Sequence, residues 1–211
     1  MTNHSHPVFA RLYDPVMGPA ERTLLAAHRR YLVDGLSGSV LDLGAGTGAM
    51  FPYFAELADA GVDVLPVAIE PDPHMRAQAV DRANEIGLDV QIEEASAEEL
   101  PFADDSFDAV VASLVFCTIP DVDAALSEVV RVLKSGGEFR FLEHVRGTGP
   151  TGTVHDVLAP AWHVVAGGCH LNRETGEVFR SDDRFELVDY SRVSSVPSSI
   201  VPVVRGTLRR R

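Results

Sequence analysis

A glycine-rich stretch over residues 40–49, VLDLGAGTGA, constrains the fold of this chain more than any other feature. The apolar residues 39–43 predict a strand, and residues 49–59 predict a helix that follows the glycines. Glycine accepts positive φ and lets a ligand approach the backbone, while a helix N-terminus offers unpaired N–H groups. The pattern predicts a nucleotide-binding loop, and a glycine turn without a ligand is the alternative.

Length and charge limit the classes of protein that this chain can belong to. Its 211 residues suffice for a single α/β domain with a full core, and its net charge of −13 disfavours nucleic acid as a partner. It has no apolar run of the roughly 18 residues that span a membrane, and its polar N-terminus does not resemble a signal peptide. We therefore expect a cytoplasmic protein without stable membrane insertion, and nothing in the sequence indicates an oligomeric state.

The basic residues are nearly all arginine, because Lys134 is the single lysine among 18 Lys and Arg residues. An acidic surface with so little lysine is what we expect of a protein from a high-salt cytoplasm. GC-rich codon usage is the alternative explanation, since it also favours arginine over lysine.

Strands and helices alternate after the glycine loop. Strands are predicted over 63–70, 89–93, 107–114 and 138–145, and helices over 73–86 and 121–134. This order predicts an α/β fold with a doubly wound, Rossmann-like sheet, in which ligands bind beyond the carboxyl ends of the strands. We divide the single domain, 1–211, into a helical cap (1–38), a core (39–145), a helical acceptor-side segment (146–183) and a terminal antiparallel hairpin (184–211).

The two flanking segments are less regular. Helices are predicted over 8–13 and 19–36, with breaks at Asp14-Pro15 and Gly18-Pro19. This cap either covers the cofactor pocket or packs permanently on the sheet edge. Beyond the core we expect a linker at 147–152, helices over 154–165 and 172–181, and strands over 185–193 and 200–208.

Two kinds of nucleotide fit the glycine loop. Gly44-x-Gly46-x-x-Ala49, with Glu70 further on, satisfies the relaxed dinucleotide fingerprint and would indicate an NAD(P)-binding oxidoreductase. Four features favour S-adenosylmethionine (SAM) instead: Asp42 before the glycines, glycine at alternate positions, the SAEELPF stretch after the third strand, and a terminal hairpin that suits a seven-stranded sheet.

The ordered motifs LDLGAGTG, AIEPDP, ASAEELPFADDSFDAVVASLVF and EVVRVLKSGGEFRFLEHV resemble the class I SAM-dependent methyltransferases that methylate small molecules and lipids. The stretch LAPAWHVVAGGCHLNRET (158–175) resembles the branch that contains the alkyl-thiol S-methyltransferases. The resemblance implies methyl transfer from SAM, with S-adenosylhomocysteine as product, to a small apolar acceptor: a thiol, a quinone-like carbon or a lipid head group. A protein that binds SAM without catalysis is a further alternative.

The resemblance also implies the cofactor contacts. Glu70 should accept hydrogen bonds from the ribose hydroxyls, and Ser96 stands where the group usually has aspartate. The predicted cofactor-binding residues are Asp42, Gly44, Ala45, Gly46, Thr47, Gly48, Glu70, Pro71, Met75, Ser96, Ala97, Ser113 and Leu114.

The acceptor side contains several histidines and an isolated tryptophan. His144, at the end of the fifth strand, is the candidate general base, and Tyr13, Cys117, Trp162 and His163 are the candidate acceptor contacts. His163, Cys169 and His170 have ligand-type side chains, but their spacing matches no usual zinc motif, so no metal is predicted.

Overall fold

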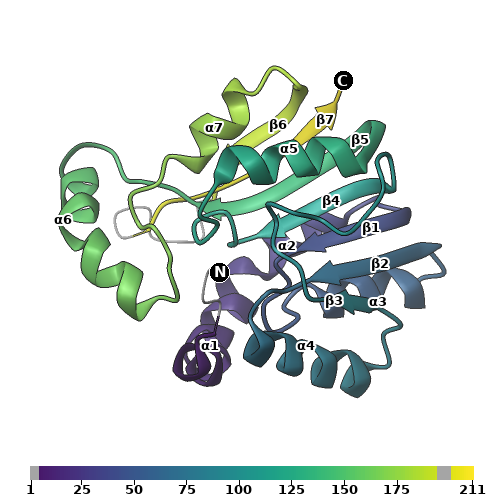
Figure 1. Ribbon diagram of the computed structural model, residues 1–211. Helices are drawn as coiled ribbons and strands as arrows, with labels where there is room; N and C mark the ends of the chain where they lie inside the picture. Colours follow the sequence, from purple (N-terminus) through teal and green to yellow (C-terminus); the bar gives the residue numbers. More distant parts are fainter. Residues whose placement is uncertain (1–4, 194–200) are drawn as a thin grey trace.

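The computed structural model describes residues 5–193 and 201–211, and its centre is a seven-stranded sheet in the order β3-β2-β1-β4-β5-β7-β6 (Figure 1). Strands β1 to β5 are parallel, whereas β7 is antiparallel to both β5 and β6. This arrangement confirms the doubly wound fold and the terminal hairpin. The strands are β1 (Gly38–Leu43), β2 (Val64–Ile69), β3 (Gln91–Glu93), β4 (Phe107–Ser113), β5 (Leu133–His144), β6 (Phe185–Arg192) and β7 (Val203–Arg210).

Helices cover both faces of the sheet. One apolar core lies under α5 and α7, and a second lies under α2, α3 and α4. In Figure 1, α6 stands away from the sheet and α1 lies beside α4. The helices are α1 (Pro7–Ala20), a π-helical turn (Glu21–Leu25), α2 (Ala26–Val33), α3 (Phe51–Asp59), α4 (Pro73–Ile86), α5 (Val122–Val132), α6 (Gly149–Val165) and α7 (Thr175–Ser181).

Local sequence explains why the central elements form where they do. The FDAVVAS run of β4 is almost wholly buried between its two neighbours, as a central parallel strand must be. Helix α4 begins where Asp72 accepts hydrogen bonds from the N–H groups of His74 and Met75, and it ends at Gly87 in the left-handed conformation. The predicted helix 73–86 is therefore confirmed residue for residue.

The predicted breaks in the cap are wrong, because α1 continues through Asp14-Pro15 and Gly18-Pro19. The Gln78 amide donates to the carbonyl of Ala10, and Arg82 pairs with Asp14. Since these contacts from α4 hold α1 along its length, tertiary packing outweighs the local preference of proline.

Other boundaries also differ from prediction. The linker expected at 147–152 is mostly the start of α6, because Pro150 lies in the first helical turn, where its missing N–H costs nothing. Residues 135–137, between the predicted helix 121–134 and the predicted strand 138–145, belong to β5, and α5 ends earlier than predicted, at Val132. The last strand is β7, Val203–Arg210, and part of its predicted range, 200, lies outside the described residues.

Within the described ranges 5–193 and 201–211, no helix combines the length and the apolar character needed to cross a membrane. The division of the chain into cap, core, acceptor-side segment and hairpin stays a prediction.

Candidate cofactor and acceptor site

The glycine loop has the backbone conformation that its sequence predicts. Gly44, Gly46 and Gly48 all have positive φ, at 73°, 59° and 80°. A Cβ atom at position 44 would also lie 2.2 Å from Cγ2 of Val115, so a side chain is excluded there by space as well as by conformation. The loop therefore needs glycine at alternate positions whether or not a ligand is bound.

Glu70 lies just past β2 and fastens the glycine loop to the neighbouring strand. Its Oε2 accepts a hydrogen bond from the Gly46 N–H at 2.9 Å, and its Oε1 accepts one from the Asp72 N–H at 2.8 Å. Burial raises the pKa of Glu70, while these two backbone hydrogen bonds act in the opposite direction. Each oxygen keeps a further lone pair with which it can accept a ligand hydroxyl.

A cavity opens between the glycine loop and the segments that follow β2, β3 and β4. It is lined by five of the predicted cofactor residues: Gly44, Glu70, Pro71, Ser96 and Ala97. The remaining lining was not predicted. Ile69 ends β2, Glu98 follows β3, and four residues follow β4: Val115, Thr118, Ile119 and Pro120.

Asp42 is buried at the end of β1 and its Oδ2 has no hydrogen-bond partner among the described residues. Desolvation raises its pKa to about 7, against the opposing field of Arg29. Arg29 comes from α2, is 3% exposed, and donates from Nε to Oγ of Ser113 at 3.2 Å. This buried arginine was not predicted, because its position in a helix of mixed polarity gives no sign of burial.

The remaining predicted cofactor residues are not among those that line this cavity. Thr47 is buried and donates from its hydroxyl to Oδ1 of Asp14 at 2.6 Å, so α1 lies against the glycine loop. Leu114 has a φ of 60°, an uncommon conformation for a branched residue, where the chain turns away from β4. Ala45 and Met75 are buried in the apolar cores or beside the loop. The cofactor contacts of all these residues stay predictions.

Removing the Asp14 side chain should loosen α1. Asp14→Ala removes the bond from Thr47 and the ion pair with Arg82, and a loss of about 1 kcal/mol would raise local amide exchange about fivefold. Hydrogen exchange of residues 7–20 measures this effect, with the exposed change Asp59→Ala as the control. Unchanged exchange in α1 would show that its other contacts hold it.

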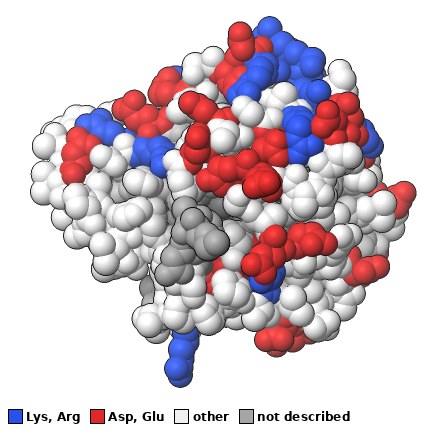
Figure 2. Space-filling view, in the orientation of Figure 1, with Lys and Arg blue, Asp and Glu red and all other residues white. Residues whose placement is uncertain are grey.

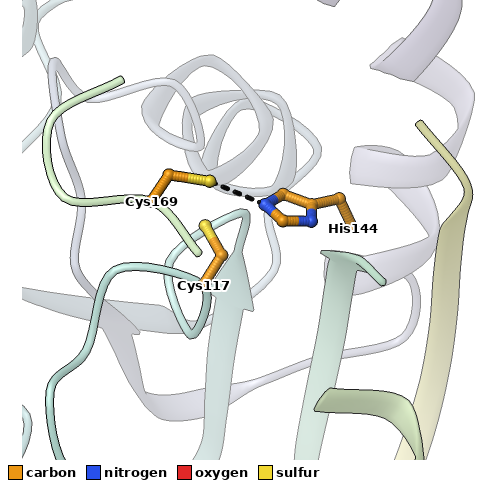
Figure 3. Close-up of side chains that lie close together, drawn as sticks. All are labelled: Cys117, His144 and Cys169. Carbon is orange, nitrogen blue, oxygen red and sulfur yellow. Dashed lines mark hydrogen bonds between the residues drawn. The ribbon is translucent and has the colours of Figure 1, made fainter. Parts of the chain in front are cut away.

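On the acceptor side, Cys117, His144 and Cys169 meet at the carboxyl edge of β4 and β5 (Figure 3). His144 Nε2 lies 2.8 Å from Sγ of Cys169, and its Nδ1 is buried with no partner among the described residues. The neighbouring Cys117 thiol and His144 hold the pKa of Cys169 well below its usual value. His144, the candidate base, therefore faces a cysteine of its own chain.

Glu143 was not predicted as a site residue, yet it holds the turn after β4 in place. It is fully buried, and its Oε1 accepts hydrogen bonds from the N–H groups of Val115 and Phe116 at 2.9 and 3.0 Å. Burial raises the pKa of Glu143 to about 7. The only sign of this role in the sequence is that the motif LEHV (142–145) places a glutamate at the end of a central strand.

The other acceptor candidates do not form a closed apolar pocket. Trp162 is partly exposed on α6 and donates from Nε1 to Sγ of Cys169 at 3.3 Å. His163 is exposed and its ring lies 4.6 Å from that of His170. Tyr13 packs edge to face on Phe9, and a Cβ atom at Gly167 would touch that same Phe9 ring, so α1 does reach the segment after α6.

The comparisons with known proteins agree with this geometry. Residues 41–141 match the methyltransferase domain family. The chain is 33% identical to the thiol S-methyltransferase TMT1A of Homo sapiens, over 79% of this chain and 68% of that protein. It is 32% identical to the phosphatidylethanolamine N-methyltransferase of Cereibacter sphaeroides, over 83% of this chain and 81% of that protein.

A solved structure shows the same fold. The geranyl diphosphate C-methyltransferase of Streptomyces coelicolor A3(2), in complex with S-adenosyl-L-homocysteine, superposes with a TM-score of 0.69 at 17% identity, over 88% of this chain and 76% of that one. The sequence relatives decide against the oxidoreductase interpretation of the glycine loop. Loop, sheet order and relatives together establish that this chain belongs to the class I methyltransferases and is an enzyme that uses S-adenosylmethionine.

Proposed function

We propose that this enzyme transfers the methyl group of SAM to the sulfur of a small apolar thiol. The observation that carries the proposal is the position of the stretch 158–175, which resembles the alkyl-thiol branch. This stretch packs directly on the turn after β4, where the His170 N–H donates to the Cys117 carbonyl at 2.8 Å. The stretch 158–175 thus contacts a turn of which Val115 and Thr118 line the cavity.

The residues around the cavity fit the cofactor. Asp42 offers a buried carboxylate oxygen that has no partner among the residues that the structure describes, which suits the ammonium of the methionine portion. Glu70 faces the cavity and can accept hydrogen bonds from ribose hydroxyls, and Pro71 and Ala97 offer apolar surface to the adenine ring. When bound, SAM supplies an activated methyl group, so the protein needs mainly to position the acceptor and exclude water.

A cation lies next to the turn after β4. Arg173 donates from its guanidinium to the carbonyls of Phe116 and Ile119, both at 2.6 Å, and Ile119 lines the cavity. A fixed cation there would stabilise an anionic acceptor such as a thiolate. The carboxylates Glu70 and Glu98 line the same cavity and act in the opposite direction, so Arg173 supports a thiolate where the acceptor lies nearer to the guanidinium than to these carboxylates.

The reaction itself needs few protein groups. The acceptor thiol gives its proton to solvent, and its thiolate sulfur forms a bond to the methyl carbon while the bond from that carbon to the cofactor sulfur breaks. The products are a methyl thioether and S-adenosylhomocysteine, whose sulfur keeps the electron pair and becomes neutral. The thiolate is the reactive form, so lowering the thiol pKa is the protein's main contribution beyond orientation.

An apolar acceptor is supported by the surface of α6. Several large apolar side chains on this helix are exposed, and Figure 2 shows that the face of this lobe is largely uncharged. The exposed residues are Val154, Val157, Leu158, Trp162, Val164 and Val165. Such a surface next to the site attracts hydrocarbon groups rather than polar ones.

An acceptor panel tests the proposal. Alkanethiols of increasing length, the matching alcohols and the matching amines are each incubated with the enzyme and methyl-labelled SAM. We expect thiols alone to be methylated, with kcat/KM rising about fourfold per methylene while the chain still fits, since each buried methylene contributes about 0.8 kcal/mol. Activity should also rise with pH as the thiol ionises.

The panel also distinguishes the alternatives. Methylation of phosphatidylethanolamine vesicles but of no thiol would place the enzyme with its N-methylating relative, and methylation of quinones alone would indicate carbon as the acceptor. Tight SAM binding with no transfer to any compound would favour a protein that binds SAM without catalysis.

A further inference from the structure

Three soft-donor side chains from distant parts of the chain converge on one buried point. Cys117 lies in the turn after β4, His144 ends β5, and Cys169 follows α6, yet their Sγ and Nε2 atoms all lie within 4.8 Å of one another. All three are at most 7% exposed. Figure 3 shows both sulfur atoms and the imidazole pointing toward a common centre.

The main chain and neighbouring side chains hold this cluster in place. The His170 N–H donates to the Cys117 carbonyl at 2.8 Å, which fixes the segment of Cys169 against the turn of Cys117. Glu143 and Arg173 hold the same turn through its N–H groups and its carbonyls. Trp162 donates from Nε1 to Sγ of Cys169 at 3.3 Å, as outer partners of metal-bound thiolates do.

We propose that Cys117, His144 and Cys169 bind one Zn²⁺ ion. Two sulfur atoms and one imidazole nitrogen form a donor set that zinc favours, and tetrahedral bond lengths place such atoms about 3.6–3.8 Å apart. The span of 4.8 Å accommodates these spacings, and the 2.8 Å contact between His144 and Cys169 must open by about 0.8 Å.

Charge balance favours the ion in this buried place. Two thiolates, a neutral imidazole and Zn²⁺ sum to zero, so the loaded site adds no net charge to the interior. Any thiol proton displaced by the metal leaves to solvent as the Zn–S bond forms. Zinc would occupy the imidazole through Nε2, while the buried Nδ1 has no hydrogen-bond partner among the described residues.

Three protein ligands leave a fourth position open, as catalytic zinc sites do. This extension rests on the proposed function, because the sulfur of a thiol acceptor is a ligand of the right kind for that position. Zinc would lower the thiol pKa there, and the released proton would pass to solvent. The site would thereby select thiols over alcohols and amines.

Metal content of the whole protein tests the site. The chain is purified with a reductant, stripped with a chelator, reloaded with ZnCl₂ and freed of excess metal, and its zinc is measured by atomic emission. We expect one zinc per chain. A content below about 0.1 per chain, in protein that still binds SAM, would overturn the proposal. A Cys117–Cys169 disulfide that persists under reductant would overturn it as well.

Variants locate the ion. Cys169→Ser and His144→Ala should each weaken zinc binding by more than the roughly 100-fold that loss of an outer-shell partner can cost. His163→Ala removes a neighbouring imidazole outside the cluster and should leave the stoichiometry unchanged. Undiminished zinc in both cluster variants would place the metal elsewhere and refute the site. SAM binding by each variant reports whether it has folded.

Cobalt(II) in place of zinc tests the open position separately from catalysis. Thiolate-to-cobalt absorption should appear in the wild type and fall in Cys117→Ser. Adding 1-hexanethiol should intensify that absorption, whereas 1-hexanol should not. If the cobalt absorption does not change when the thiol is added, the acceptor does not occupy the fourth position, although the metal site itself is still supported. The zinc content and the cobalt spectrum do not depend on the acceptor panel, so they test the metal site even if no thiol is methylated.

Discussion

Glu70→Ala should weaken SAM binding by about 100-fold or more. A carboxylate that accepts hydrogen bonds from two ribose hydroxyls contributes about 1.5–3 kcal/mol through each bond, and alanine removes both. The same change frees the Gly46 N–H, so the glycine loop loses its tie to β2. Cofactor affinity should therefore fall through lost contacts and through a less ordered loop.

Calorimetric titration with SAM and with S-adenosylhomocysteine measures this loss. Glu93→Ala is the matched control, because Glu93 ends the adjacent strand β3 but does not line the cavity. Glu70→Gln keeps the shape of the side chain and should have an intermediate effect. An affinity within twofold of the wild type for Glu70→Ala would mean that the ribose binds elsewhere.

The sequence could predict that Gly44 and Glu70 lie close together, because their positions depend on local pattern and on sheet order. Gly44 and Glu70 each follow a strand whose apolar run is plain in the sequence, and parallel strands bring their carboxyl ends to one edge. Two such residues must therefore face one cavity, and both line it in the structure.

The contacts among the acceptor-side residues could not be predicted from the sequence, because they join segments that no periodic pattern relates. Cys169 reaches His144 only through the path of α6, whose start was predicted as a linker. His163 and His170 were considered for a metal site in place of Cys117, since closeness in sequence was the only available guide. Burial of Arg29 was not predicted because burial of a charge depends on its partners, and its partner Ser113 lies on β4, far away in the sequence.

Asp42→Asn should stabilise the folded protein above neutral pH and at the same time weaken SAM binding. Burial raises the pKa of Asp42 from 3.8 to about 7 in the folded state. Between these values the unfolded chain has lost the proton that the folded chain retains, so each pH unit lowers the free energy of unfolding by about 1.4 kcal/mol. Above pH 7 both states are ionised, and a total penalty of about 4 kcal/mol remains.

Asparagine avoids this penalty because it has no charge to bury. The difference in unfolding free energy between Asp42→Asn and wild type should grow by about 1.4 kcal/mol per pH unit from pH 5 to 7 and then level off. Urea unfolding at several pH values measures it, with Asp59→Asn on the surface as control. The pKa of Glu143 is also raised to about 7, but Glu143 is present in both proteins, so its contribution cancels in the difference between Asp42→Asn and wild type.

The same carboxylate should make cofactor binding depend on pH in the opposite direction. If the ionised form of Asp42 holds the ammonium of SAM, wild-type affinity should rise up to tenfold per pH unit below about 7 and become constant above it. Asp42→Asn should bind SAM weakly, and its affinity should not rise with pH.

If the stability difference between Asp42→Asn and wild type does not change with pH, Asp42 is not strongly desolvated. If the stability difference does follow pH while SAM affinity does not, the buried charge serves the fold and not the ligand. If both follow pH, the enzyme retains a destabilising carboxylate because its cofactor requires the charge.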